Sequence, residues 1–235
     1  MSNKTNNRLA LTVAAALSVS LALAAAPSSA AVTPVVVTNN TGFAVSNNDL
    51  LNGLTGVVVG NISSQEGLQS NTTGSALTDG TFGRVAIDSG ANPGMTIIHN
   101  GVSITYMLTS NALGYNISQI DTFTGWRDPG RFQQDYSVSF AYKASPTEFL
   151  NAINVAAHPA NANDAKVSLS NAGGAALATG VVGVRFNFAN VQNGFVGYRE
   201  LDVLGSAVVP EPASMLLFGL GALALVGARR RSLSK

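Results

Sequence analysis

Apolar and polar residues alternate at period two in four segments of the middle of the chain. These segments are 102–108, 136–142, 184–188 and 200–203. Such alternation is typical of β-strands with one buried face. No segment between the two ends shows a long helical period, and 147–157 offers one short helix or turn. The pattern therefore predicts an all-β protein with a β-sandwich fold.

Turn signals separate the expected strands. Asn100-Gly101 divides the run 95–99 from the strand that begins at Val102. Because both turn residues tolerate positive φ, this arrangement predicts a β-hairpin. Further turns are expected at Asn52-Gly53, Asp79-Gly80 and Asn193-Gly194.

The N-terminus has the three parts of a secretory signal peptide. Lys4 and Arg8 form a positively charged start, 9–26 is apolar, and the small residues of 28–30 mark a cleavage site. We expect the signal peptide 1–30 to be removed on export. The alternative is a helix that stays in the membrane as an anchor.

The C-terminus has a second three-part pattern. A linker with prolines at 206–212 is followed by an apolar stretch at 213–228 and a basic tail at 229–235. A helix over the apolar stretch is about 24 Å long, shorter than the ~30 Å hydrocarbon core. It therefore suits a transient transmembrane segment whose arginines stay in the cytoplasm. The prolines keep the linker extended and accessible.

This tail resembles the PEP-CTERM sorting signal of Gram-negative bacteria. The residues that carry the resemblance are Val209, Pro210, Glu211, Pro212, Arg229, Arg230 and Arg231. The resemblance implies recognition by exosortase, a membrane protease-transpeptidase, after export by the secretion machinery and a transient stay in the inner membrane. Proteins with this signal often accompany exopolysaccharide production. A plain C-terminal membrane anchor is the alternative.

Charge and composition exclude several function classes. The chain of 235 residues has no cysteine, so disulfides, thiolate metal sites and thiol nucleophiles are excluded. The net charge of +1 comes from the two ends, because 31–209 holds eleven acidic against seven basic side chains and has a charge of −4. Nothing in that balance supports nucleic-acid binding.

The middle of the chain resembles the galactose-binding-like jelly roll, the fold of discoidin and coagulation-factor C domains. The resemblance spans 74–205 and rests on the segments 77–80, 114–121, 125–138 and 197–205. The closing segment, Tyr-Arg-Glu-Leu-Asp-Val-Leu-Gly, is its most specific part. The resemblance implies binding of a sugar or another surface ligand through loops at one end of the sandwich. It leaves 31–73 as an N-terminal β segment of the mature domain.

The same resemblance implies a structural calcium ion. Its ligands would be Asp79 of the first Asp-Gly turn, Glu200 of the last strand and Thr81 as a third oxygen. Calcium takes six to eight oxygen ligands, so backbone carbonyls would complete the set. The alternative is that Asp79 is an ordinary turn residue and Glu200 a solvent-facing strand residue.

The candidate ligand site surrounds the one tryptophan of the chain. Trp126 lies in the loop 125–134, beside Arg127, Asp128 and Arg131. An exposed ring stacks on the apolar face of a sugar, while arginine and aspartate bind its hydroxyls. The competing interpretation is that the ring closes one end of the core and that Arg131 pairs with an aspartate, Asp128 or Asp135.

We therefore expect an exported protein of the cell envelope, cell surface or extracellular matrix. Its β-sandwich would bind carbohydrate without catalysis and would be associated with exopolysaccharide or biofilm. The alternative is a structural matrix or coat protein with no specific ligand. A glycoside hydrolase is least expected, because His99 and His158 lack a catalytic motif and no spacing ties Asp121 to Asp128.

Overall fold

The computed structural model describes residues 32–63, 73–83, 94–126 and 129–209. The predicted signal helix and the predicted C-terminal apolar helix both lie outside the described residues, as does the sorting tail from Pro210 onward. Within the described ranges, no helix is both long enough and apolar enough to cross a membrane.

Strands make up almost all of the regular structure. They are β1 (Val35–Asn39), β2 (Val57–Val59), β3 (Ile62–Ser63), β4 (Thr96–His99), β5 (Ser103–Met107), β6 (Tyr115–Gly125), β7 (Gln134–Tyr142), β8 (Ser145–Ala157), β9 (Asp164–Ser170), β10 (Ala178–Phe188) and β11 (Phe195–Ala207). Two 3₁₀ turns, η1 (Ser75–Leu77) and η2 (Gln192–Gly194), complete the described elements. The all-β prediction is confirmed.

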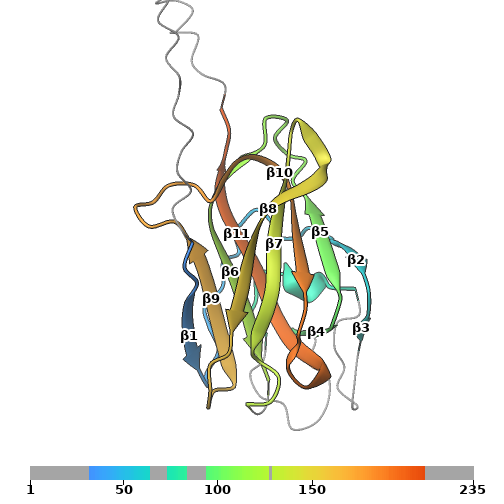
Figure 1. The fold of residues 1–235 in the computed structure, drawn as a ribbon, viewed down its shortest axis with the longest axis vertical. Helices are drawn as coiled ribbons and strands as arrows, with labels where there is room; N and C mark the ends of the chain where they lie inside the picture. The colour runs from blue at the N-terminus through green and yellow to red at the C-terminus, as the bar shows by residue number, and fades with distance from the viewer. Residues whose placement is uncertain (1–31, 64–72, 84–93, 127–128, 210–235) are drawn as a thin grey trace, which may run out of the picture.

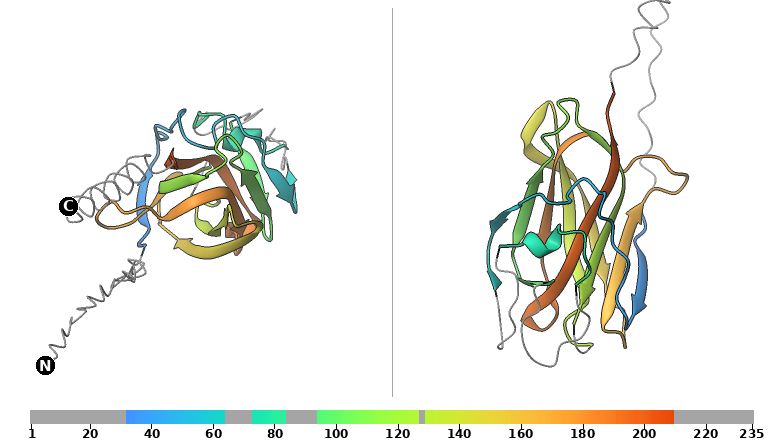
Figure 2. Two further views of the ribbon diagram at one scale, coloured as in Figure 1. Left: turned by 90° about the horizontal axis from the view of Figure 1, so that it is seen from above. Right: turned by 180° about the vertical axis from the view of Figure 1, so that it is seen from behind.

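The strands form two antiparallel layers (Figure 1). One layer runs β1-β9-β6-β11-β4-β3, and the other runs β8-β7-β10-β5-β2. Pairs Ala178↔Ile117 and Val181↔Tyr115 join β10 to β6, which connects the layers at one end. Figure 2 shows the layers from above, curving around a shared interior. Most neighbours within each layer are distant in sequence, whereas β7 and β8 follow each other directly and form a hairpin. The predicted β-sandwich jelly roll is confirmed.

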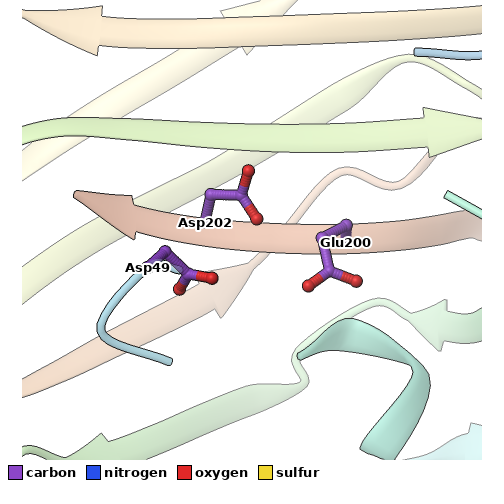
Figure 3. A group of neighbouring side chains, drawn as sticks. All are labelled: Asp49, Glu200 and Asp202. Atoms are coloured by element: carbon purple, nitrogen blue, oxygen red, sulfur yellow. The ribbon is translucent and has the colours of Figure 1, made fainter. Parts of the chain in front are cut away.

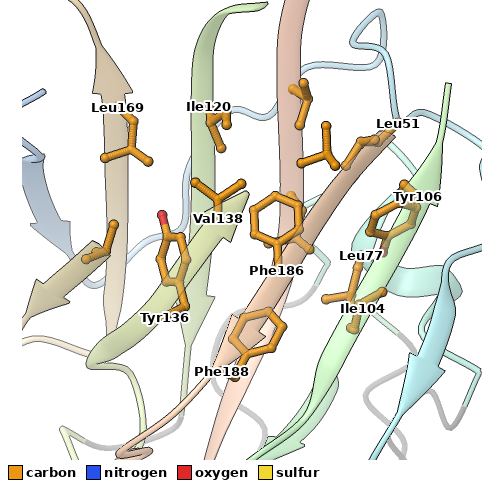
Figure 4. Close-up of a cluster of buried hydrophobic side chains, with 14 of the residues drawn as sticks. Leu51, Leu77, Ile104, Tyr106, Ile120, Tyr136, Val138, Leu169, Phe186 and Phe188 are labelled. Carbon is orange, nitrogen blue, oxygen red and sulfur yellow. The ribbon is translucent and has the colours of Figure 1, made fainter. Parts of the chain in front are cut away.

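The core lies between the layers because alternate residues of each strand point inward. Ile104, Val138 and Phe186 come from three strands of one layer, and Ile120 faces them from β6 of the other (Figure 4). Each such side chain contributes roughly 1.5–3 kcal/mol by leaving water. The period-two segments of the sequence are the strands that supply this core.

The N-terminal part of the mature chain belongs to the same sandwich. β1 pairs with β9, β2 pairs with β5, and β3 pairs with β4. Strands that precede residue 74 thus complete edges of both layers.

The hairpin predicted at Asn100-Gly101 is wrong. Gly101 does sit in a turn, with φ of 79°. However, β4 pairs with β11 and β3, while β5 pairs with β10 and β2. The turn carries the chain from one layer to the other, because each flanking strand buries its apolar face against partners from elsewhere in the chain.

The short helix or turn predicted at 147–157 is also wrong, since these residues lie in the 13-residue strand β8. Pairing with β7 decides the outcome, and Val155 and Ala157 reach the core through it. Asn151 has φ of 56°, a left-handed conformation that a helix does not accept. The register with β7 shifts beside this residue, between Val138 and Phe140. Tertiary pairing has therefore overridden a weak local pattern.

A loop covers the outer side of β11. The loop between β1 and β2, residues 40–56, is called the cover loop here. The amide of Leu50 donates to the carbonyl of Val203 at 2.8 Å, and the amide of Ser46 donates to Oδ2 of Asp202 at 2.8 Å. The loop therefore buries side chains of β11 that would otherwise face water.

Candidate functional site

Three carboxylates meet beneath the cover loop, and they are called the acidic cluster here. Glu200 and Asp202 occupy alternate positions of β11 and so share its outer face. Asp49 reaches them from the cover loop (Figure 3). One oxygen from each residue lies within 4.8 Å of the others. Glu200 is 0% exposed and Asp202 is 1% exposed.

Each carboxylate satisfies one oxygen and leaves the other without a partner. Oδ1 of Asp49 accepts from the amide of Leu51 at 2.7 Å, and Oε1 of Glu200 accepts from the amide of Gly80 at 3.2 Å. Oδ2 of Asp202 accepts from Ser46, as described above. The second oxygens, Oδ2 of Asp49, Oε2 of Glu200 and Oδ1 of Asp202, are buried with no hydrogen-bond partner in the described structure. Each of the three carboxylates therefore has one unsatisfied oxygen.

Burial makes negative charge unfavourable in the acidic cluster. It raises the pKa of Glu200 to about 9 and that of Asp202 to about 7, and neighbouring carboxylates add to both shifts. Burial also raises the pKa of Asp49. Lys166, whose ammonium pairs with Asp121 at 2.7 Å, lowers the pKa of Asp202 and is the smallest of the influences on it. Bound protons or a bound cation would therefore offset the cost of burying these negative charges.

The structure brings only part of the sequence-predicted calcium set to this cluster. Asp79 and Thr81 are exposed, and Oδ1 of Asp79 accepts from both the amide and the hydroxyl of Thr81, at 2.9 and 2.7 Å. Glu200 touches their turn through Gly80. Its carboxylate instead groups with those of Asp49 and Asp202.

Sequence reasoning missed Asp49 and Asp202. Glu200 and Asp202 are two residues apart in a strand-like segment, and this spacing was a usable signal that their carboxylates share a face. Nothing in the local sequence of Asp49 shows that its loop folds back on β11.

Trp126 lies inside the molecule. Its side chain is 2% exposed and packs with Met95, Ile97 and Phe195 in a small core of its own. The guanidinium of Arg131 lies 4.2 Å from the centre of the Phe195 ring and 5.5 Å from that of Trp126. A buried ring offers no stacking surface, so this geometry favours the interpretation that Trp126 closes one end of the core. Arg127 and Asp128 lie outside the described residues.

The two histidines have ordinary neighbours. The ring of His99 packs against that of Phe195, with centres 5.6 Å apart. Nε2 of His158 lies 2.7 Å from Oδ2 of Asp135.

An open depression, called the polar groove here, lies on the outer face of β7, β8 and β10. It has a volume of about 360 Å³. Its lining includes Asp135, Ser137, Asn154, Asn187 and Asn190. Strand register aligns Asn154, Ser137 and Asn187 in one row across the three strands. The result is a line of amide and hydroxyl groups that face solvent.

Comparison with known proteins identifies the tail. Residues 208–231 match the PEP-CTERM protein-sorting motif. The chain carries a PEP-CTERM sorting signal. The match includes Val209, which is 75% exposed at the end of the described residues, and extends through the apolar segment to Arg231. None of the curated proteins compared with the chain matches it.

Three solved structures are among those similar to the middle of the chain. The lectin domain of lectinolysin, complexed with Lewis B antigen, has 12% identity and a TM-score of 0.44, covering 69% of this chain and 100% of that one. The family 32 carbohydrate-binding module of C. perfringens NanJ, in complex with galactose, has 12% sequence identity and a TM-score of 0.40. The match covers 63% of this chain and 97% of that one. Chitosan-binding module 1 from a Paenibacillus sp. IK-5 chitosanase/glucanase has 13% sequence identity and a TM-score of 0.41. The match covers 67% of this chain and 99% of that one. These values assign no ligand, and the fold rests on the strand pairing.

Proposed function

We propose that this protein is an exported, non-catalytic carbohydrate-binding β-sandwich, delivered to the cell surface or extracellular matrix through its PEP-CTERM signal. The polar groove is the observation that carries the proposal. It is a solvent-facing recess built on strands, and its lining includes asparagine and serine side chains that can hydrogen-bond to sugar hydroxyls. The sorting signal supports delivery to a compartment in which extracellular polysaccharide is the abundant ligand.

The groove has the chemistry that sugar recognition needs. Each asparagine amide offers two donors and an acceptor, and a serine hydroxyl offers both, so the row matches the mixed donors and acceptors of a sugar ring. Asn187 and Ser137 are held in place by a contact of 3.5 Å between Nδ2 and Oγ. The volume of about 360 Å³ lies in the range of small-ligand sites. A short stretch of a polysaccharide is therefore a suitable ligand.

The groove is not built for hydrolysis. Glycosidases use two carboxylates on opposite sides of the scissile bond. Among the described residues that line the groove, Asp135 is the one carboxylate, and it is paired with His158. Binding without bond cleavage is the function that this arrangement supports.

The sorting pathway forms the second part of the proposal. The signal peptide 1–30 directs export, and the segment 213–228 holds the chain transiently in the inner membrane while 229–235 remains in the cytoplasm. An exosortase-type enzyme then acts near Pro210-Glu211-Pro212 and releases the domain to the surface. Association with exopolysaccharide or biofilm follows from this route and from the groove.

A glycan array tests the binding proposal. The mature protein, purified after export, is applied beside the double variant Asn154→Ala/Asn187→Ala and the control variant Asn48→Ala. Asn48 is an exposed asparagine in the cover loop, on the opposite layer. We expect the wild type and the control to retain the same glycans and the double variant to lose them. Equal retention by all three proteins would exclude the groove.

One observation favours the structural matrix function instead. Among the described residues, β1 pairs with β9 alone, and Val35 and Val37 on it are 57% and 49% exposed. In the same part of the chain, β2 pairs with β5 alone, and Val57 and Val59 are 65% and 64% exposed. Free apolar edges are templates for pairing between copies. Light scattering distinguishes the two functions, because a matrix protein would form large assemblies that Val36→Lys reduces.

A further inference from the structure

The acidic cluster has the layout of a cation site. Two oxygens that share a calcium ion, each about 2.4 Å from it, lie at most ~4.8 Å apart. The three carboxylates of the cluster fulfil this condition. Glu200 and Asp202 are almost completely buried, and each has one buried oxygen without a hydrogen-bond partner in the described structure.

The ligand atoms also indicate which kind of cation fits. All three are carboxylate oxygens, the ligands that hard divalent ions prefer, and neither nitrogen nor sulfur belongs to the set. A single calcium ion would offset the repulsion among two buried carboxylates and the half-buried carboxylate of Asp49. Bidentate binding, carbonyl oxygens or water would complete its coordination.

We infer that Asp49, Glu200 and Asp202 bind one calcium ion, which fastens the cover loop to β11. This site shares Glu200 with the set implied by the sequence resemblance but replaces Asp79 and Thr81. The carboxylate of Asp79 is exposed and pairs with Thr81, and neither residue belongs to the group of carboxylates that meet at β11. The inference goes beyond carbohydrate binding and does not depend on it.

The site has a structural consequence for the cover loop. Near the cluster, the loop is held to β11 by three backbone donors: Leu50 to Val203, Ser46 to Asp202, and Val203 to Asp49. Without a cation, two of those contacts end on carboxylates that repel their neighbours. Calcium therefore converts a repulsive junction into a crosslink between residues about 150 positions apart in sequence.

The test uses the mature protein, stripped with EDTA and titrated with calcium by calorimetry. We expect one calcium ion per chain and a rise in the melting temperature on binding. Asp49→Asn and Asp202→Asn should each weaken calcium binding by about tenfold or more. The matched control Asp79→Asn, which alters the resemblance-based site alone, should bind calcium like the wild type. Magnesium and zinc, titrated separately, should bind more weakly than calcium.

A second measurement separates lost binding from lost folding. In EDTA, Asp202→Asn should melt at the same temperature as the wild type or higher, because it removes one of the repelling charges. In calcium, the order should reverse. Absence of calcium binding to the wild type would overturn the inference. So would loss of binding in Asp79→Asn together with full binding in Asp202→Asn, which would locate the ion at the Asp79 turn.

Discussion

Trp126→Ala separates the two interpretations of the tryptophan most sharply. The indole fills a small core against Met95, Ile97 and Phe195. A Cβ at Gly197 would lie 2.8 Å from its Cε3 atom, which shows how closely β11 approaches the ring. Removal of the ring would leave a cavity that these rigid strands cannot readily fill.

The expected loss of stability follows from this burial. Replacing a buried Phe or Trp by Ala lowers the free energy of unfolding by about 3–5 kcal/mol. The indole Nε1 is buried without a hydrogen-bond partner in the described structure, which offsets part of the gain from burial and favours the lower end. For a domain of this size, each kcal/mol shifts the melting temperature by about 2–4 °C. At this lower end, about 3 kcal/mol, Trp126→Ala should therefore melt about 6–12 °C below the wild type.

Thermal unfolding followed by circular dichroism measures this shift, with Trp126→Phe as the control. The phenylalanine keeps most of the apolar contact and loses the unpartnered donor, so its melting temperature should stay much closer to that of the wild type. The reasoning is refuted if Trp126→Ala unfolds at the wild-type temperature. If that stable variant also loses glycan retention, the ring contacts ligand and the stacking interpretation is correct.

Three further predictions follow. The raised pKa values of Glu200 and Asp202 mean that the folded chain binds more protons than the unfolded chain. In EDTA, the free energy of unfolding should therefore fall as the pH rises from about 5 to about 9, and added calcium should remove this fall. Denaturant titrations at several pH values measure both effects. Gly197→Ala should cost about 1–3 kcal/mol in the same assay, because its Cβ would lie 2.5 Å from Sδ of Met95 and 2.8 Å from the carbonyl of Gly125. Mass spectrometry of the exported protein should find a C-terminus upstream of the apolar segment, whereas an intact end at Lys235 would contradict exosortase processing.

The strands were predictable where burial of one face produces an alternation of apolar and polar residues in the sequence. The segments 136–142 and 184–188 alternate cleanly because one side packs in the core and the other faces water. Pairing was less predictable, as Asn100-Gly101 shows. A turn signal reports local φ preference, whereas the partners of the flanking strands depend on contacts with distant residues.

The site was predictable in part for the same reason. Glu200 came from a resemblance in the last strand, and its neighbour Asp202 could have been added from strand periodicity. Asp49 could not, because its distance from Glu200 depends on how the cover loop folds. For Trp126, the loop position favoured exposure, while the packing around Phe195 decided its burial.

Titration of the mature protein with the extracellular polysaccharide of the producing cells tests the central claim most directly. We predict saturable binding by the wild type, unchanged binding by Asn48→Ala, and loss of binding in Asn154→Ala/Asn187→Ala with an unchanged melting temperature. Absence of binding by the wild type, or equal binding by the double variant, would contradict a carbohydrate site in the polar groove.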